Sequence, residues 1–278
     1  MSKHIDALGT RMKQYENCYR IYLPKRSAIC VRLDMRAGHS FTKGFERPYD
    51  EIFAQTMQQT ALKLAENVSG CKFAFQQSDE ISLVLTDYDS INTEPWFGNN
   101  LQKIVSITAS MATMYFNGFF RTNAYKEDAI FAAKNYHECS DPIIESHLRA
   151  VGRMATFDSR AFILPREEVF NYFWWRQTDT VRNSIQLVGQ AYFSHKRLQN
   201  KNCDEIQEML WQEHSINWSK YPNWFKNGVS IYRRPTIVKH ETPQGIVEVE
   251  RNKWVIDTET PIFTQDHEYI NKHIGVKD

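Results

Sequence analysis

The sequence predicts an α+β protein with a ferredoxin-like split βαβ core, in which helices cover one face of an antiparallel sheet, followed by a C-terminal elaboration of helices and a β-hairpin. Three observations support this fold class. Four short segments are rich in β-branched, aliphatic or aromatic residues, as strands are: 28–34, 71–75, 81–85 and 156–163. Two longer segments repeat apolar residues at the helical period: 50–68 and 99–119. Their order along the chain is strand, helix, strand, strand, helix, strand, which is the split βαβ pattern.

The first strand, residues 28–34, carries aliphatic residues up to a carboxylate at Asp34. A loop through Gly38 and Gly44 follows it. The first helix begins after Asp50, whose side chain suits an N-cap. The apolar positions of this helix recur every three or four residues and stop before Gly70: Phe53, Met57, Ala61, Leu64 and Val68.

The next two strands form a hairpin, because only a short connection separates residues 71–75 from residues 81–85. This connection places Asp79 and Glu80 at a strand edge or turn. The second helix carries small and apolar residues on several sides, which predicts packing on more than one face. The fourth strand then completes the core.

The chain beyond residue 165 is expected to pack on this core. Three elements are predicted there, a long helix, a short helix and a hairpin: 167–194, 204–211, and 229–234 with 247–256. We therefore divide the chain into a core, residues 1–165, and a C-terminal elaboration, residues 166–278. The boundary separates sub-structures that need not fold independently.

Composition excludes several classes of protein. The 278 residues are 42% hydrophobic and 24% charged, which is the balance of a globular protein rather than a disordered one. The formal net charge is +1, so no bulk field indicates a nucleic acid or membrane partner. No apolar run approaches the roughly 20 residues of a membrane span. The five cysteines form no CxxC pair, which favours reduced thiols. We expect a cytoplasmic enzyme or binding protein with no membrane partner.

The strongest chemical feature is a pair of aspartates. The first and third strands of a split βαβ sheet are neighbours, so Asp34 can meet Asp79. Two carboxylates about 4 Å apart repel by about 1 kcal/mol in water and about 4 kcal/mol at a protein-like dielectric, so they favour a proton or a divalent cation between them. Magnesium suits such a pair best, together with substrate phosphates. The alternative is a solvated turn at Asp79 and a simple cap at Asp34.

Adjacent residues in a strand face opposite sides of the sheet, so we expect only one of Asp79 and Glu80 to bind the ion together with Asp34, and we favour Asp79. Glu80 is then expected to position these metal ligands or to stabilise the fold. Cations lie close in sequence, at Arg36, His39 and Arg47. Such groups bind triphosphates by charge and forked hydrogen bonds.

Six ordered motifs between residues 30 and 230 resemble those of the tRNA-histidine guanylyltransferase superfamily. They are RLDMRAGHSF at 32–41, FERPYD at 45–50, SDE at 78–80, FDSR at 157–160, WRQTD at 175–179 and INW at 216–218. The resemblance implies a polymerase-palm core that uses two magnesium ions to add nucleotides to the 5′ end of tRNA in the 3′-to-5′ direction. It also implies ATP and GTP or other nucleoside triphosphates as substrates, and a homotetramer.

The resemblance assigns roles to individual residues. Metal binding falls to Asp34, Asp79 and the backbone carbonyl of Met35, with Glu80 as their essential catalytic neighbour. Contacts to the nucleotide or its triphosphate are implied for a wider set: Arg36, His39, Arg47, Ser78, Lys103, Arg160 and Asn217.

Three departures from the family pattern stand out. Met35 replaces a usual Gly, and Ser159 replaces another in the arginine motif. After Asp179, the histidine-specific enzymes carry His-Ile-Asn-Asn-x-Tyr-Asn, which is tied to the histidine anticodon, whereas residues 181–187 are VRNSIQL and share only Asn183. This chain is therefore similar to the guanylyltransferase-like proteins that repair 5′-truncated tRNA by templated addition.

RNA contacts are expected from basic residues near aromatic ones, because cations meet phosphates and aromatic rings stack on bases. The candidates are Lys196, Arg197 and Lys201. The alternatives are the histidine-specific guanylyltransferase, a palm-fold nucleotide cyclase-like enzyme and an RNA-binding module without catalysis. The presence of both Asp34 and Asp79 among basic residues argues against the last of these.

Overall fold

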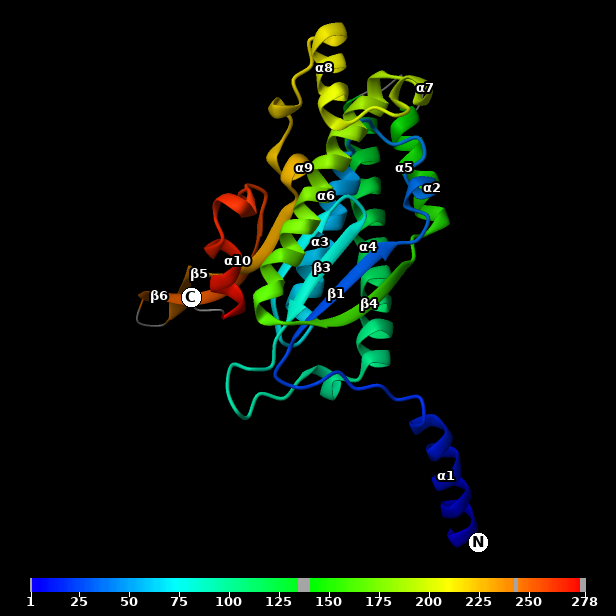
Figure 1. Ribbon diagram of the computed structural model, residues 1–278, viewed down its shortest axis with the longest axis vertical. Helices are drawn as coiled ribbons and strands as arrows, with labels where there is room; N and C mark the ends of the chain where they lie inside the picture. Colours follow the sequence, from blue (N-terminus) through cyan, green and yellow to red (C-terminus); the bar gives the residue numbers. More distant parts are fainter. Residues whose placement is uncertain (1, 135–140, 243–244, 276–278) are drawn as a thin grey trace.

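The computed structural model confirms the predicted fold class and describes residues 2–134, 141–242 and 245–275. The strands are β1 (Ala28–Met35), β2 (Cys71–Gln77), β3 (Glu80–Leu85), β4 (Phe157–Leu164), β5 (Val229–Thr242) and β6 (Gly245–Asp257). They form one antiparallel sheet in the order β4-β1-β3-β2-β5-β6, with helices on both faces (Figure 1). The first four strands are the split βαβ core, and the C-terminal hairpin extends the same sheet beyond β2.

The two core helices are α3 (Glu51–Asn67) and α4 (Leu101–Lys134). Asp50 caps α3 as predicted, because its carboxylate accepts the Phe53 amide at 2.9 Å. Helix α4 is longer than predicted, and it is followed by α5 (Pro142–Arg153), which was not predicted. The expected loop after β1 contains a short helix, α2 (Gly38–Phe41).

Alternation along β1 sends its side chains to two different cores. Ile29, Val31 and Leu33 pack with α3 and α4 in the larger hydrophobic cluster. Ala28 and Cys30 face the opposite side, where they pack with α6 (Arg166–Tyr192) and α10 (Glu268–Ile274). The C-terminal part of the chain therefore covers the second face of the core sheet, and Asp34, an even-numbered position like Cys30, is on that face.

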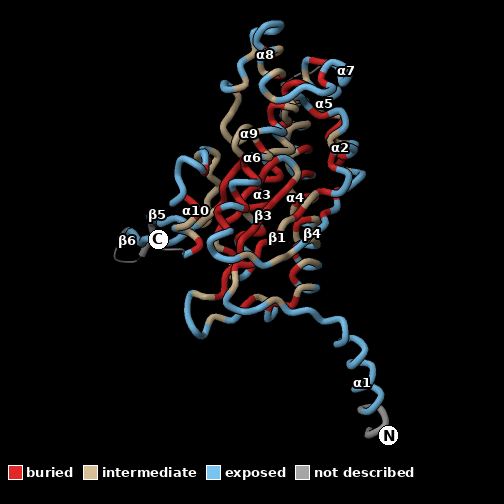
Figure 2. The backbone as a smooth tube through the Cα atoms, viewed as in Figure 1, coloured by how far each residue is buried: buried red, intermediate tan, exposed pale blue. Residues whose placement is uncertain are grey.

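The remaining elements lie around this sandwich: α1 (Ser2–Asn17), α7 (His195–Leu198), α8 (Cys203–His214), α9 (Asn223–Asn227), and the 3₁₀ turns η1 (Trp96–Asn99), η2 (Trp218–Lys220) and η3 (Phe263–Gln265). Helix α1 projects from the rest of the chain, and its side chains are exposed from Ala7 onward (Figure 2). No helix within the described residues is long and apolar enough to span a bilayer. Cys18, Cys30, Cys71 and Cys203 are free thiols, while Cys139 lies outside the described residues.

Candidate active site

Asp34 and Asp79 come together at one end of the sheet. Asp34 is the penultimate residue of β1, and Asp79 lies in the turn between β2 and β3. Strands β1 and β3 are paired antiparallel, with Asp34 opposite Glu80. The Met35 amide also donates to the Asp79 carbonyl at 3.1 Å, which ties the end of β1 to the turn.

The Asp79 carboxylate packs against Gly38 at the start of α2. A Cβ atom at position 38 would lie 2.2 Å from Asp79 Oδ2, so this approach needs a residue without a side chain. Burial raises the pKa of Asp79, and the charge of Asp34 raises it further. The two carboxylates therefore carry an electrostatic cost that a bound cation would relieve.

Glu80 is enclosed by arginines rather than directed to the two aspartates. Its carboxylate is 2.7 Å from Arg32 Nη2 and 3.1 Å from Arg176 Nε, and the residue is 5% exposed. Burial raises its pKa, and the two arginines oppose that rise. Arg32 Nη2 is also 3.2 Å from Asp34 Oδ2. In this geometry Glu80 ties β3 to α6 and fixes Arg32 beside Asp34, and as the cross-strand partner of Asp34 it lies on the same face of the sheet.

The donor set fits magnesium. Within the described residues, no group of three or more His, Cys, Asp or Glu side chains gathers as a metal site. The ligands that the resemblance implies are two aspartates and the backbone carbonyl of Met35, the last residue of β1. Magnesium suits such sparse ligation, because it retains waters and takes substrate phosphate oxygens, unlike zinc, which needs three or four protein ligands.

Basic residues border the aspartates on two sides. Arg160 on β4 reaches toward Asp34, with 3.8 Å between Nη2 and Oδ2, and contacts Asp158 at 3.2 Å. Arg36 and His39 lie in the segment just after β1, and both are exposed. The structure thus brings these three predicted residues to the same end of the sheet as Asp34.

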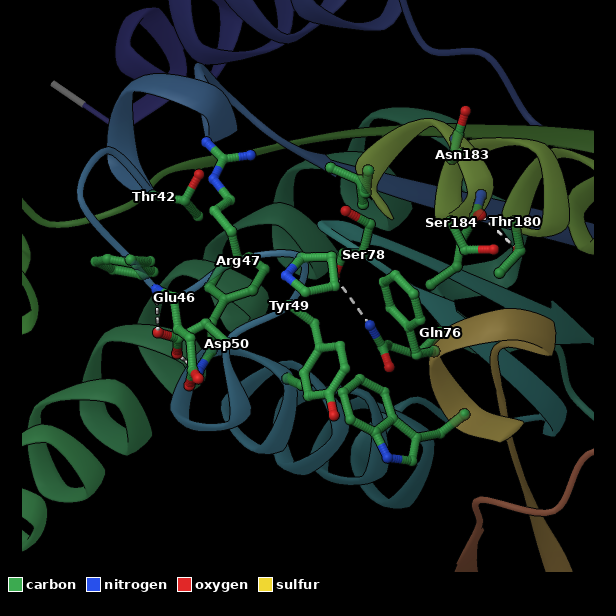
Figure 3. Close-up of a pocket in the computed structure, with 18 residues that line it drawn as sticks. Thr42, Glu46, Arg47, Tyr49, Asp50, Gln76, Ser78, Thr180, Asn183 and Ser184 are labelled. Atoms are coloured by element: carbon green, nitrogen blue, oxygen red, sulfur yellow. Dashed lines mark hydrogen bonds between the residues drawn. The ribbon is translucent and has the colours of Figure 1, made fainter. Parts of the chain in front are cut away.

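A pocket opens beside Ser78, the residue that precedes Asp79. The empty space in this pocket is about 810 Å³ when the open solvent at its mouth is included. Arg47 and Ser78 line it, with Tyr49 and Trp224 as aromatic walls and Asn183 from α6 (Figure 3). Ser78 adopts a positive φ of 45°, and its carbonyl accepts a hydrogen bond from Gln76 Nε2 at 2.9 Å, which helps to fix the turn between β2 and β3.

The pocket wall that carries Arg47 rests on a charged triad around a buried histidine. His147 on α5 is fully buried, with Nε2 2.7 Å from Asp50 Oδ2 and Nδ1 2.8 Å from Glu127 Oε2. Carboxylates only accept hydrogen bonds, so both contacts are satisfied when the imidazole is doubly protonated. Asp50 in turn accepts the Glu46 amide at 3.2 Å. His147 therefore holds the carboxylate that orders the segment from Glu46 to Asp50.

We predict that this triad makes stability depend on pH. Burial alone lowers the pKa of His147, but its bonds to Asp50 and Glu127 outweigh burial, so the pKa lies above its usual 6.5. A raised folded-state pKa stabilises the fold fully below pH 6.5, and this stabilisation is lost as pH rises through the folded-state pKa. In urea unfolding, the deficit of His147→Gln relative to wild type should thus be largest near pH 6 and shrink on raising the pH. A deficit independent of pH would contradict the charged triad.

The structure does not bring Lys103 to the aspartates within one chain. Lys103 lies in the first turn of α4, which begins beside the segment entering β1, because the Leu101 amide donates to the Ile21 carbonyl at 2.9 Å. Asp34 is at the other end of β1, roughly 20 Å away along a strand that rises about 3.3 Å per residue. Asn217 is exposed and caps η2, because its side chain accepts a hydrogen bond from the Ser219 amide.

The three candidate RNA contacts lie far along the C-terminal part, and two of them are already paired. Arg197 makes a forked ion pair with Glu213, at 2.8 and 2.5 Å, and Lys201 is 2.8 Å from Glu205. Lys196 makes no ion pair with any described residue. Of the three, Lys196 is therefore the cation whose charge is not already neutralised by an ion pair with a described residue.

Comparisons with known proteins decide the family. A family model described as tRNAHis guanylyltransferase matches residues 9–165, more than half of the chain. The chain belongs to the tRNAHis guanylyltransferase family. It is accordingly a nucleotidyltransferase that acts on tRNA 5′ ends.

Relatives match nearly the whole chain. A bacterial tRNAHis guanylyltransferase-like protein in complex with ATP is 39% identical with a TM-score of 0.76, covering 97% of this chain and 100% of that one. A bacterial structure of the same description in complex with GTP gives 38% and 0.74 over the same shares. The tRNAHis guanylyltransferase of Saccharomyces cerevisiae is 27% identical over 241 residues, covering 82% of this chain and 90% of the yeast chain.

Two departures from the guanylyltransferase pattern have a structural explanation. Met35 still belongs to β1 and is buried in the larger core, and the positive φ occurs two residues later, at Ala37 (55°). Position 35 therefore needs no left-handed backbone. Ser159 faces α4, where its hydroxyl is 2.8 Å from the hydroxyl of Thr108. This bond ties β4 to the helix behind it.

Several residues at this site were not predicted from the sequence. Arg32 and Arg176 surround Glu80, and His147 supports the pocket wall. A signal for Arg32 was present, since a charged residue two positions before Asp34 in a strand shares its face. His147 had no such signal, because its role depends on two residues that are distant in sequence.

Proposed function

We propose that this protein adds nucleotides in the 3′-to-5′ direction to the 5′ end of truncated tRNA, templated by the opposing strand, after activating a 5′-monophosphate end with a nucleoside triphosphate. The observation that supports this best is the Ser78–Asp79 turn, because Ser78 lines the pocket and the next residue, Asp79, lies close to Asp34. A nucleotide in the pocket could extend its phosphates past Ser78 toward Asp34 and Asp79.

ATP and GTP are the proposed nucleotides, since the bacterial relatives were solved with each of them. The aromatic walls of the pocket, Tyr49 and Trp224, suit a base, because nucleobases stack on aromatic rings. Arg47 at the pocket and Arg160 beside Asp34 would pair with phosphate oxygens. The exposed Arg36 and His39 lie between Asp34 and Arg47 in sequence.

We propose that two magnesium ions are held by Asp34, Asp79 and the Met35 carbonyl oxygen. When bound, magnesium neutralises charge that develops on the transferred phosphoryl group. The protein itself contributes the positions of the two carboxylates: Arg32 holds Asp34 from one side, and the contact with Gly38 limits where the Asp79 carboxylate can move.

Substrate choice follows from residues 181–187, the stretch that departs from the histidine-anticodon motif. Val181 and Leu187 pack with the apolar cluster around Ile185. The Ser184 hydroxyl accepts Trp218 Nε1 at 3.0 Å and donates to the Val181 carbonyl at 2.8 Å. Val181, Leu187 and the Ser184 hydroxyl therefore make their contacts within the protein. Recognition of an unstacked base by its edge instead needs hydrogen-bond donors and acceptors that are free. We therefore propose that the enzyme selects its tRNA by the missing nucleotides at the 5′ end, and selects the added nucleotide by base pairing with the opposing strand.

The decisive test offers the enzyme truncated histidine and non-histidine tRNAs with each of the four templating bases, and sequences the added nucleotides. We expect the Watson–Crick complement on tRNAs of several identities, and no extension of a tRNA with a complete acceptor stem. Strict dependence on the histidine anticodon, or guanosine addition whatever the template, would instead assign the dedicated histidine enzyme.

A further inference from the structure

We propose that the indole of Trp175 is a stacking platform for the 5′-terminal nucleobase of the RNA substrate, an inference that rests on the proposed function. Trp175 lies on α6, next to the arginines that surround Glu80. Nothing in the chemistry of the aspartates or of the nucleotide pocket requires an aromatic residue at this position. Three observations nevertheless give it the properties of such a platform.

The first observation is that the ring is held in place from the protein side. The guanidinium carbon of Arg176 lies 4.1 Å from the centroid of the Trp175 ring, and that of Arg32 lies 6.0 Å from it. The Tyr172 ring meets it edge-on, with centroids 6.0 Å apart. Cation–π contacts of this kind fix the orientation of an indole. The ring therefore has a defined position before any ligand arrives.

The second observation is exposure. The residue is 54% exposed, although Arg176 beside it is 1% exposed. Covering the Arg176 guanidinium explains why one side of the indole is buried, but it leaves the rest of the ring open to water. Burying apolar area is worth roughly 25 cal/mol per Å², so an open aromatic surface forgoes stability that a ligand could recover.

The third observation is the link to the aspartates. Arg32 lies near the Trp175 ring, and the same guanidinium contacts Asp34 at 3.2 Å. Arg160, whose side chain is 55% exposed, also reaches toward Asp34. An RNA end whose phosphate lies at Asp34 would thus have a cation for its backbone and an aromatic face for its terminal base. Single-strand binding proteins combine the same two elements.

Trp174 provides a matched control. It is the preceding residue on α6 and is 45% exposed, but its indole makes no ring or cation contact with the described residues. Successive helical positions point about 100° apart. Trp174 therefore presents a similar exposed area without the link to Arg32 and Asp34.

The experiment uses truncated tRNA with 2-aminopurine as its 5′-terminal base, whose fluorescence is quenched on stacking, and measures the KM for RNA in parallel. Stacking is worth about 1–3 kcal/mol per base, so Trp175→Leu should raise that KM roughly 5- to 150-fold and abolish quenching. Trp175→Phe should retain most of both. Leucine still covers Arg176, so this difference separates stacking from a purely structural role. Trp174→Leu should behave like wild type.

The outcomes distinguish this platform from the proposed function. Addition by wild type without quenching, or equal effects of leucine and phenylalanine at position 175, would overturn the platform and leave the function intact. A change of molecular mass by light scattering in Trp175→Leu would assign the ring to a subunit contact and also overturn it. A wild-type protein that extends no RNA end would overturn the proposed function, and the platform with it.

Discussion

Replacing Asp79 with asparagine should abolish nucleotide addition and at the same time raise the thermal stability of the protein. The loss follows from the proposed magnesium site, because charge neutralisation at a transferred phosphoryl group is worth several kcal/mol, or roughly a thousandfold or more in rate. The gain follows from the structure, because burial and the charge of Asp34 raise the pKa of Asp79 and make its ionised form unfavourable in the apo protein. An amide removes that charge and keeps nearly the same shape.

A loss of nucleotide addition together with a gain in thermal stability cannot be explained by misfolding of the Asp79→Asn variant. Asp34→Asn should also abolish addition, but with no gain in stability, because Asp34 contacts Arg32. Asp89→Asn is the control: Asp89 is paired with Lys72 and lies beyond the other end of β3, and this variant should keep its activity. The measurements are addition to truncated tRNA at saturating magnesium and thermal unfolding without the metal. Near-normal addition by Asp79→Asn would remove Asp79 from the site.

The sequence was sufficient for the four core strands and for the proximity of Asp34 and Asp79, because the strands follow from local patterns and their pairing follows from the split βαβ topology. Alternating and periodic apolar residues predicted the four core strands and their helices, and the split βαβ topology makes β1 and β3 neighbours. The contact between the end of β1 and the turn with Asp79 follows directly from that pairing. The N-cap at Asp50 was equally local, since it involves an amide only three residues away.

Other parts of the site could not be predicted because they depend on contacts between distant segments. The triad joins Asp50, Glu127 and His147, which lie on three elements, and α5 was itself missed despite the Asp141-Pro142 start signal. Lys103 is the converse case, and its contact with the nucleotide stays a prediction. Its helix was correctly predicted, but the spacing along the chain does not show that this helix begins at the far end of β1.

Arg176→Met should be among the most destabilising single substitutions in the chain. Arg176 is 1% exposed and contacts Glu80 at 3.1 Å and Asp179 at 2.5 Å. Removing one partner of a buried ion pair typically costs about 3–5 kcal/mol. We expect about 3 kcal/mol in urea unfolding, the lower end, because Arg32 still contacts Glu80. Arg197→Met is the matched control, since its forked pair with Glu213 is exposed and should contribute less than about 1 kcal/mol.

The double variant Arg176→Met with Glu80→Leu separates stability from function. Replacing a buried ion pair by apolar residues of similar size is often neutral or stabilising, so most of the lost stability should return. Nucleotide addition should not return, because Glu80 also contacts the guanidinium of Arg32, which lies beside Asp34. Recovery of both would mean that the network serves folding alone. A cost for Arg176→Met no larger than that of Arg197→Met would show that the cluster is solvated, and that Glu80 does not tie β3 to α6.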